Sequence, residues 1–258
     1  MLSQVFYGVG TIILKGYSST AQTVVALLRN LAAMKNVKSQ DRKGCENMKI
    51  YIIRHGETAL NAKGVMQGRI NEPLNENGRN LAALTGRGMQ GIRFDACISS
   101  PLSRALETAE LVLRESGSDL SIRTDDRLLE MDFGDIDARK ITEMGEESMS
   151  FFMAPFQFPG FPNGESIRGL CERTQPFLKE LIAKDDGKTY LISTHGCAMR
   201  AMTNYLMESP SDFWLGHAPY NCSLTIVEAE GGAARITDID RVFYDPKLIA
   251  DYSQITME

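Results

Sequence analysis

Residues 49–58 read KIYIIRHGET, an apolar run that stops abruptly at Arg54, His55 and Gly56. Apolar residues at nearly every position are typical of a strand that is buried on both faces of a sheet. Gly56 can adopt backbone angles closed to other residues, so the chain can leave the strand there. We therefore expect Arg54 and His55 at the carboxyl end of a central strand, where open α/β sheets bind their ligands. The pair suggests an anion site with a nucleophile or base, although two such residues alone more often simply end a strand.

The composition is that of an ordinary globular protein. Its 258 residues are 43% hydrophobic and 24% charged, which is enough chain for one large domain or two small ones. The net charge of -5 argues against nucleic acid as a partner. Five cysteines, an odd number without CxxC spacing, indicate free thiols in a reducing, cytoplasmic compartment and argue against a disulfide or zinc framework.

Residues 1–47 differ in charge from the rest of the chain. They hold six Lys or Arg against two acidic residues, in a protein of net charge -5. The apolar stretch before Lys15 is too short to span a bilayer and lacks the cleavage site of a signal peptide. Residues 23–34 could form a basic amphipathic helix at a membrane surface. We favour a disordered or dispensable extension, with the folded domain over residues 48–258 and no membrane partner.

A turn-rich segment, residues 61–69, follows the first strand. It has too many turn formers for a long helix. Asn61, Gln67 and the backbone at Gly68 could all donate hydrogen bonds to an oxyanion, and a solvated loop is the alternative.

Helical and strand patterns alternate along the rest of the chain. Asn75 is the expected N-cap of the first long helix, and Gly88 lies near its end. We expect helices over residues 74–89, from about 101 onward, and from an opening at residues 163–166 to about 184. We expect strands over residues 94–98, 121–123 and 188–194, and a hairpin of residues 221–227 and 234–240 around residues 231–232.

The second informative stretch is SSPLSRALETA, residues 99–109. Pro101 suits the first turn of a helix and Ser100 suits its N-cap. Arg104 then lies in the first turn, where the free N–H groups and the helix dipole attract anions. An arginine at that place is reasonable if an anion lies between the guanidinium and the helix N-terminus, whereas a surface ion pair with Glu107 or another acid is the structural alternative.

Glu130 stands among apolar neighbours in the segment RLLEMDFGD, residues 127–135. Burial raises the pKa of a carboxyl group, and a nearby dianion raises it further. A general acid that works at neutral pH needs such a shift. The alternative is a carboxylate that pairs with an arginine, which is the commoner role of an isolated glutamate.

Five phenylalanines follow within eleven residues, among prolines. They could line a substrate entrance, but such a cluster more often packs a cap onto the core, which we favour. The five are Phe151, Phe152, Phe156, Phe158 and Phe161.

Residues 188–200, KTYLISTHGCAMR, repeat the pattern of the opening stretch. An apolar strand again ends in His-Gly, at His195 and Gly196, and a helix again follows. If the two strands are neighbours, His55 and His195 face each other across one crevice. His217 has no comparable context, and we expect it to be structural.

Together these segments resemble the histidine phosphatase superfamily, which has the phosphoglycerate mutase-like fold, in its branch of small cytoplasmic phosphatases. Coverage runs in the family's order from residue 48 to about residue 240. The matching stretches are residues 54–58 with Asn61, residues 67–68, residues 99–105, residues 129–130 with 133–135, and residues 193–196.

The resemblance implies a three-layer α/β/α sandwich around a mainly parallel sheet. It also implies that His55 is the nucleophile, forming a phosphohistidine, and that Glu130 is the proton donor. No cofactor and no metal ion are implied, because two guanidiniums and a protonated His195 would neutralise a phosphoryl dianion. The residues that the resemblance places around the phosphoryl oxygens are Arg54, Arg104 and His195, helped by Asn61, Gln67, Gly68 and Gly196.

Three functions are compatible with this resemblance. The first is hydrolysis of a small phosphorylated metabolite, which we favour because the segment after Glu130 is short, whereas mutases of the family carry extra segments that wall off the site. A phosphoglycerate mutase-type transferase is the second, and an inactive phosphate-binding module is the third. Related phosphatases often continue Gly-Asp-Trp-Glu-Gly where this chain reads GDIDA, residues 134–138, so the sequence does not identify the substrate. It does not indicate the oligomeric state either.

Overall fold

The structure, a computed structural model, describes residues 47–143, 145 and 149–248. The contacts of the chain separate a unit of Glu46–Glu258 from the residues before it, and the described fold belongs to this unit. The extension predicted over residues 1–47 lies outside the described residues apart from Asn47, so it stays a prediction.

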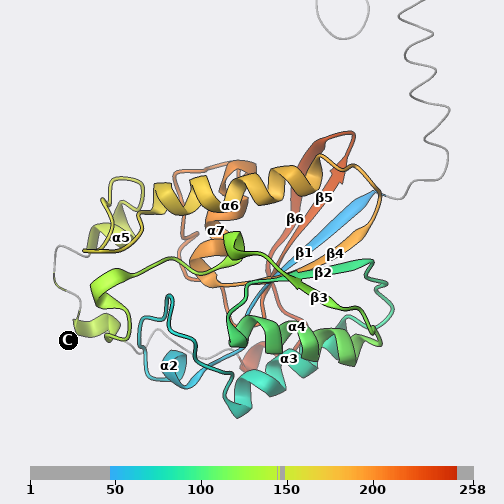
Figure 1. The fold of residues 1–258 in the computed structure, drawn as a ribbon, viewed down its shortest axis with the longest axis horizontal. Helices are drawn as coiled ribbons and strands as arrows, with labels where there is room; N and C mark the ends of the chain where they lie inside the picture. Colours follow the sequence, from blue (N-terminus) through green and yellow to red (C-terminus); the bar gives the residue numbers. More distant parts are fainter. Residues whose placement is uncertain (1–46, 144, 146–148, 249–258) are drawn as a thin grey trace, which may run out of the picture. The chain divides into compact units, whose positions relative to one another are not determined.

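A six-stranded sheet runs through the described unit (Figure 1) in the order β3-β2-β4-β1-β5-β6. The first four of these strands are parallel, and β5 pairs antiparallel with both β1 and β6. The predicted α/β fold with a mainly parallel sheet is therefore confirmed. The strands are β1 Met48–Arg54, β2 Ala96–Ser99, β3 Ile122–Thr124, β4 Thr189–Thr194, β5 Leu224–Glu230 and β6 Ala233–Arg241.

Helices cover both faces of the sheet and complete the three layers (Figure 1). Helices α3 and α4 pack on one face, and α6 and α7 pack on the other. The helices are α2 Ala59–Ala62, α3 Glu76–Gly88, α4 Ser103–Ser116, α5 Met149–Met153, α6 Ile167–Ile182 and α7 Gly196–Thr203, with short 3-10 turns at η1 Asp126–Leu128, η2 Gly134–Ile136, η3 Ile141–Glu143, η5 Asn204–Leu206 and η6 Pro246–Leu248.

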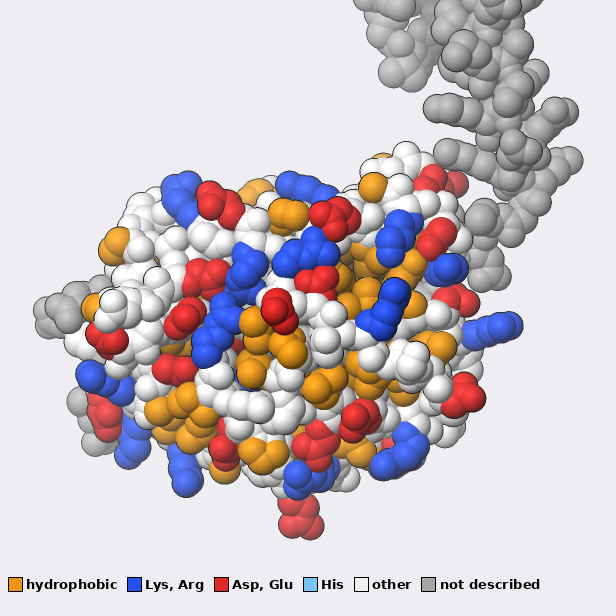
Figure 2. Space-filling view, in the orientation of Figure 1, with side chains coloured by type: hydrophobic (Ala, Val, Ile, Leu, Met, Phe, Trp, Pro, Cys, Tyr) orange, Lys and Arg blue, Asp and Glu red, His pale blue; other side chains and the backbone are white. Residues whose placement is uncertain are grey.

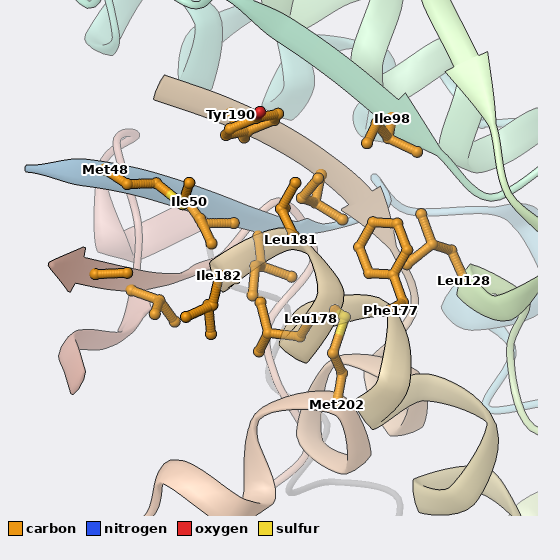
Figure 3. Packing of buried hydrophobic residues seen from close by; sticks show 14 of the residues in the cluster. Met48, Ile50, Ile98, Leu128, Phe177, Leu178, Leu181, Ile182, Tyr190 and Met202 are labelled. Carbon is orange, nitrogen blue, oxygen red and sulfur yellow. The ribbon is translucent and has the colours of Figure 1, made fainter. Parts of the chain in front are cut away.

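The position of β1 explains its uninterrupted apolar sequence. Ile50 and Ile52 pack against α6 side chains such as Leu178 on one face of the sheet (Figure 3). Tyr51 and Ile53 pack in the second core cluster, with side chains of α3 and α4 on the other face. Because both faces are covered, β1 lacks the polar alternation of a half-exposed strand.

The two predicted helix caps have different outcomes. Asn75 caps α3 as expected, since its Oδ1 accepts the N–H of Gly78 at 2.7 Å. The prediction that Ser100 caps the next helix is wrong, because the N-cap of α4 is Leu102, which has no side-chain acceptor. The Ser100 hydroxyl instead lies 2.7 Å from a ring nitrogen of His195, so it belongs to the site around that histidine.

A close backbone contact fixes the loop after β1 against α3. A Cβ atom at Gly78 would lie 2.1 Å from the carbonyl oxygen of Glu57, and one at Gly56 would lie 2.6 Å from the carbonyl oxygen of Gly78. The Glu57 carboxylate also accepts the side-chain N–H of Asn75 at 2.7 Å. The loop that carries His55 is therefore held by backbone packing as well as by hydrogen bonds.

The phenylalanine cluster belongs mainly to the core, as predicted. Phe151, Phe158 and Phe161 are buried in one hydrophobic cluster, which Trp214 borders. Phe152 is 36% exposed and lines, with Trp214, a cavity of ≈ 400 Å³. Phe156 is partly buried and packs against the same cluster, so the core interpretation is confirmed for four of the five, whereas Phe152 lies at the surface.

The described surface is mixed in charge. Figure 2 shows basic and acidic side chains interspersed with apolar ones on the face it displays. Within residues 47–143, 145 and 149–248, no helix combines the length and hydropathy that crossing a bilayer requires.

Candidate active site

The two histidines of the predicted motifs lie side by side at the ends of neighbouring strands. β1 and β4 are parallel, with Arg54 opposite Thr194, and the N–H of His55 donates to the Thr194 carbonyl at 2.9 Å. The ring centroids of His55 and His195 are 5.1 Å apart, with 60° between the ring planes. The structure therefore brings together the two imidazoles that the sequence placed at equivalent strand ends.

His55 is held as a neutral imidazole. Its Nδ1 lies 2.7 Å from the carbonyl oxygen of Gly56, and a carbonyl can only accept, so Nδ1 carries the proton. Burial, followed by the charges of Arg104 and Arg54, holds the pKa of His55 well below its ordinary value of 6.5. The Nε2 lone pair is consequently available for attack at neutral pH.

His195 is also neutral in the unliganded structure, whereas the protonated form was expected around a phosphoryl dianion. Its Nδ1 lies 3.2 Å from Nε of Arg104, which can only donate, so Nδ1 accepts. Its Nε2 then carries the proton and donates to the hydroxyl oxygen of Ser100 at 2.7 Å. Burial and the neighbouring charge of Arg104 lower the pKa of His195 well below 6.5. The cations at this site are therefore arginines and not an imidazolium.

Arg104 lies in the first turn of α4, as predicted, and its side chain is fully buried. Nη1 donates to the carbonyl of Ile70 at 2.7 Å and Nη2 to the carbonyl of Gly68 at 2.9 Å. Burial lowers the pKa of Arg104 to about 10, so the guanidinium stays charged at neutral pH. The alternative ion pair with Glu107 is wrong, because that carboxylate binds Arg79.

Two buried donors of the predicted site have no hydrogen-bond partner among the described residues, Nε of Arg54 and Nε2 of Gln67. The rest of each side chain is fixed: Nη1 of Arg54 donates to the carbonyl of Pro219, and Oε1 of Gln67 accepts the hydroxyl of Thr58 at 2.7 Å. An unpaired buried donor costs about 1–3 kcal/mol. A phosphoryl group would supply the missing acceptors.

The other groups predicted to bind phosphate differ in whether their donors are available. The backbone N–H of Gly68 is not free as expected, because it donates to Oδ1 of Asp137 at 2.7 Å. Asn61 accepts the N–H of Thr58 with its side-chain oxygen at 3.3 Å, which leaves the NH₂ group as a donor. A Cβ at Gly196 would lie 3.6 Å from Nε of Arg54, so this glycine stands at the wall of the site.

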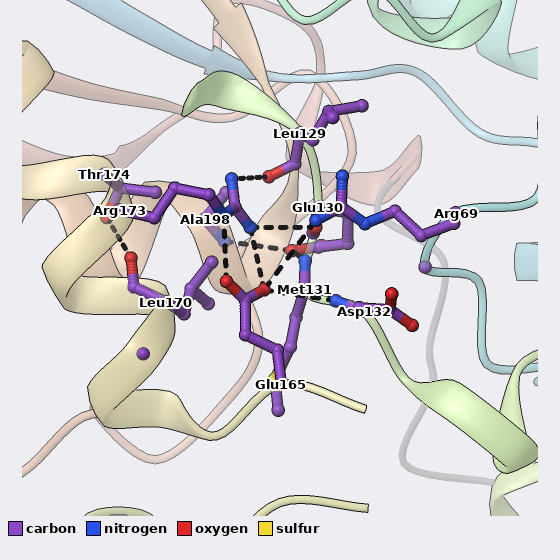
Figure 4. Close-up of polar contacts among 12 residues, drawn as sticks. Arg69, Leu129, Glu130, Met131, Asp132, Glu165, Leu170, Arg173, Thr174 and Ala198 are labelled. Atoms are coloured by element: carbon purple, nitrogen blue, oxygen red, sulfur yellow. Dashed lines mark hydrogen bonds and ion pairs between the residues drawn. The ribbon is translucent and has the colours of Figure 1, made fainter. Parts of the chain in front are cut away.

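Glu130 is buried against the N-terminus of α7 (Figure 4). Oε1 accepts the backbone N–H groups of Met131 at 2.8 Å and Ala198 at 3.0 Å, and Oε2 accepts that of Cys197 at 3.1 Å. These donors include the unpaired N–H groups that open a helix. The carboxyl group is thereby fixed at the N-terminus of α7, the helix that follows His195.

Arg173 supports the segment that carries Glu130 (Figure 4). Its Nη2 donates to the carbonyl of Glu130 at 3.1 Å, and its Nη1 donates to that of Leu129 at 3.0 Å. The same guanidinium forms a bidentate pair with Glu165, both contacts at 2.8 Å. Oε2 of Glu165 also accepts the N–H of Asp132 at 3.2 Å, so the pair clamps the backbone on both sides of Glu130.

The described residues contain no group of three His, Cys, Asp or Glu side chains placed to hold a metal ion. The site does combine a neutral imidazole, two guanidiniums and a buried carboxyl group. Such a set can bind a phosphoryl dianion, attack it at phosphorus and exchange a proton with the leaving oxygen.

The family model of the histidine phosphatase superfamily (branch 1) matches residues 50–241. The chain belongs to the histidine phosphatase superfamily. The predicted family is thus confirmed, and this membership identifies the chain as an enzyme of the histidine phosphatase type.

Relatives of this histidine phosphatase include both phosphatases and mutases. A probable phosphoglycerate mutase, GpmB, from Salmonella arizonae is 29% identical over 184 residues, which are 70% of this chain and 85% of that protein. The structure of Bacillus stearothermophilus YhfR has a TM-score of 0.69 and 30% identity, and the match covers 76% of this chain and 98% of that one. The structure of a phosphoserine phosphatase from Entamoeba histolytica, a mutant in complex with phosphoserine, has a TM-score of 0.66 and 26% identity, and the match covers 75% of this chain and 96% of that one.

Sequence reasoning missed four residues that hold the site of this histidine phosphatase in place. Ser100 was interpreted as a helix cap, and Asp137 as a departure from the family pattern. Nothing in the sequence around Arg173 and Asn221 indicates their roles; Asn221 donates its side-chain N–H to the carbonyl of His55 at 3.0 Å. Each acts on a residue that is distant in the chain, so no local pattern could have indicated it.

Proposed function

We propose that this histidine phosphatase hydrolyses phosphate monoesters of small metabolites through a phosphohistidine on His55. The neutral imidazole of His55 carries the proposal: Nδ1–H is held by the carbonyl of Gly56 at 2.7 Å, which leaves Nε2 unprotonated. A phosphoryl acceptor must offer a lone pair, and covalent capture divides hydrolysis into two easier steps.

In the first step Nε2 of His55 attacks phosphorus while Arg54 and Arg104 hold the phosphoryl oxygens. The bond from phosphorus to the leaving oxygen breaks, and Glu130 gives its proton to that oxygen. In the second step Glu130 takes a proton from water, whose oxygen attacks the phosphohistidine. The phosphorus–nitrogen bond breaks and returns neutral His55 with inorganic phosphate.

Charge stabilisation in this proposal comes from two guanidiniums. In the unliganded site His195 is neutral, and a bound phosphoryl dianion would raise its pKa, so the permanent positive charge comes from the arginines. Arg54 and Arg104 offer planar, permanently charged donors that match phosphoryl oxygens. Phosphoryl transfer needs mostly positioning and charge stabilisation, which this pair can supply without a metal ion.

A phosphoglycerate mutase-type transferase is the second candidate, because the relative GpmB is a probable phosphoglycerate mutase. A mutase must shield its phosphohistidine from water until the product receives the phosphoryl group. The chain between Glu130 and the helix α6 is short, which supports the hydrolase.

The test uses the full chain after treatment with a chelator. We expect it to release phosphate from an aryl phosphate, to lose this activity in His55→Ala, and to keep it in His217→Ala, a control whose side chain is 41% exposed. Isomerisation of 3-phosphoglycerate without phosphate release would support the mutase instead. Full activity of His55→Ala would contradict both candidates.

A further inference from the structure

The carboxylate of Asp137 is surrounded by three consecutive backbone N–H groups. Oδ1 accepts the N–H of Gly68 at 2.7 Å, and Oδ2 accepts those of Arg69 at 2.9 Å and Ile70 at 3.2 Å. Successive N–H groups that converge in this way form an anion-binding nest. Here the anion is a side chain of the protein itself, 67–69 residues further along the chain.

The same three-residue loop gives its carbonyl groups to Arg104. Nη2 of Arg104 donates to the carbonyl of Gly68 at 2.9 Å, and Nη1 donates to that of Ile70 at 2.7 Å. The loop therefore lies between a carboxylate that binds its N–H groups and a guanidinium that binds its carbonyls. In the peptide group that joins Gly68 and Arg69, the N–H binds Asp137 and the carbonyl binds Arg104, and each contact polarises this group in the sense that strengthens the other.

Backbone pairing holds Asp137 beside this loop. The N–H of Ala138 donates to the carbonyl of Met66 at 3.0 Å, and the N–H of Met66 donates to the carbonyl of Arg139 at 2.8 Å. Asp137 is thus held through its side chain and through the main chain next to it. Any shift of Asp137 therefore moves the loop of residues 68–70 with it.

We propose that Asp137 is a positioning residue of the phosphate site: through the loop of residues 68–70 it fixes the position of the Arg104 guanidinium. The inference rests on the proposed function, because it requires Arg104 to bind the phosphoryl group. The negative charge of Asp137 also opposes the effect of burial on Arg104 and helps keep that side chain protonated.

The neighbouring Asp135 provides a matched control. Its carboxylate is exposed and accepts the side-chain N–H of Asn163 at 3.1 and 3.2 Å. None of the contacts described for Asp135 leads to Arg104. A substitution there changes the same charge in the same segment without touching the loop.

The experiment compares Asp137→Asn with Asp135→Asn. Asparagine has one oxygen, so its NH₂ group must face either the N–H of Gly68 or those of Arg69 and Ile70. We expect Asp137→Asn to bind inorganic phosphate on the order of tenfold more weakly by calorimetry, with a similar fall in kcat/KM. We expect Asp135→Asn to match the wild type, and Asp137→Glu, which retains a carboxylate, to recover most of the loss.

A double-mutant cycle separates positioning from a merely structural role. In an Arg104→Ala background, Asp137→Asn should cause no further loss of phosphate affinity. An equal loss in both backgrounds, wild-type affinity in Asp137→Asn, or a variant that does not fold would overturn the inference. If the wild type binds phosphate but turns over no ester, the proposed function fails while the calorimetric test of Asp137 still stands.

Discussion

Nε of Arg104 lies 3.2 Å from Nδ1 of His195, and because a guanidinium only donates, this contact fixes which imidazole nitrogen carries the proton. The proton is on Nε2, which donates to Ser100. One buried cation thereby keeps the second histidine neutral and oriented. In the unliganded site at neutral pH the positive charge is therefore that of the arginines.

Ser100→Ala should remove the hydrogen bond that fixes the orientation of the His195 ring. The substitution removes the acceptor at 2.7 Å from Nε2 and leaves a buried N–H unpaired, which costs about 1–3 kcal/mol of unfolding free energy. We expect kcat to fall on the order of tenfold and nitrogen NMR to show a changed tautomer balance for His195. Ser103→Ala is the control, because the Ser103 hydroxyl has no partner among the described residues. An unaltered tautomer in Ser100→Ala would contradict the assigned role.

The free energy of unfolding should fall as the pH is lowered below about 6.5. His55 and His195 have folded-state pKa values well below 6.5, whereas the unfolded chain titrates near that value. Below pH 6.5 the unfolded state thus binds more protons, and each histidine adds a slope of up to about 1.4 kcal/mol per pH unit. Above pH 6.5 neither histidine contributes to the pH dependence of the unfolding free energy.

Urea unfolding between pH 5 and pH 8 measures this dependence. The slope of unfolding free energy against pH should be smaller in His55→Asn and in His195→Asn than in the wild type, in each case by the contribution of the histidine that was removed. Parallel curves for the wild type and both buried-histidine variants would refute the neutral, buried state.

Glu130→Gln should affect chemistry and stability separately. Without a transferable proton, turnover of esters with poor leaving groups should fall about 10²-fold or more, and that of activated aryl esters should fall less. The new NH₂ group should also face a backbone N–H, for example that of Cys197, and cost about 1–3 kcal/mol of unfolding free energy. Glu110→Gln on the exposed face of α4 is the control. Equal slowing of every ester would count against proton donation.

Gly78→Ala should destabilise the fold, although helix propensity alone favours alanine at this position in α3. A Cβ there would lie 2.1 Å from the Glu57 carbonyl, so the loop that carries His55 must shift. We expect a loss of about 1–3 kcal/mol in unfolding free energy together with lower kcat. Gly169→Ala in α6 is the matched control: its nearest contacts are at 3.5 Å, and replacing a helical glycine gains about 0.5–1 kcal/mol. Similar stabilities for the two variants would show that the contact relaxes freely.

The main elements of the fold could be predicted from local sequence. The apolar run of residues 50–53 indicated a strand covered on both faces, and Asn75 indicated where α3 begins. Ser100 was interpreted wrongly because serine before Pro101 looks the same in sequence whether its hydroxyl caps a helix or binds a distant imidazole. Local patterns record which backbone a segment prefers but not which distant polar group each side chain meets.

The sequence by itself placed the two histidines at strand ends and Arg104 in a first helical turn, through periodicity and turn chemistry, and its resemblance to the histidine phosphatase superfamily joined them with Arg54 and Glu130 in one site. Only the tertiary structure decided their states and supports. It showed that His195 is neutral, that the N–H of Gly68 is occupied by Asp137, and that Glu130 is seated on the N–H groups of α7. Burial and hydrogen-bond direction set protonation, and both exist only once residues far apart in the chain have come together.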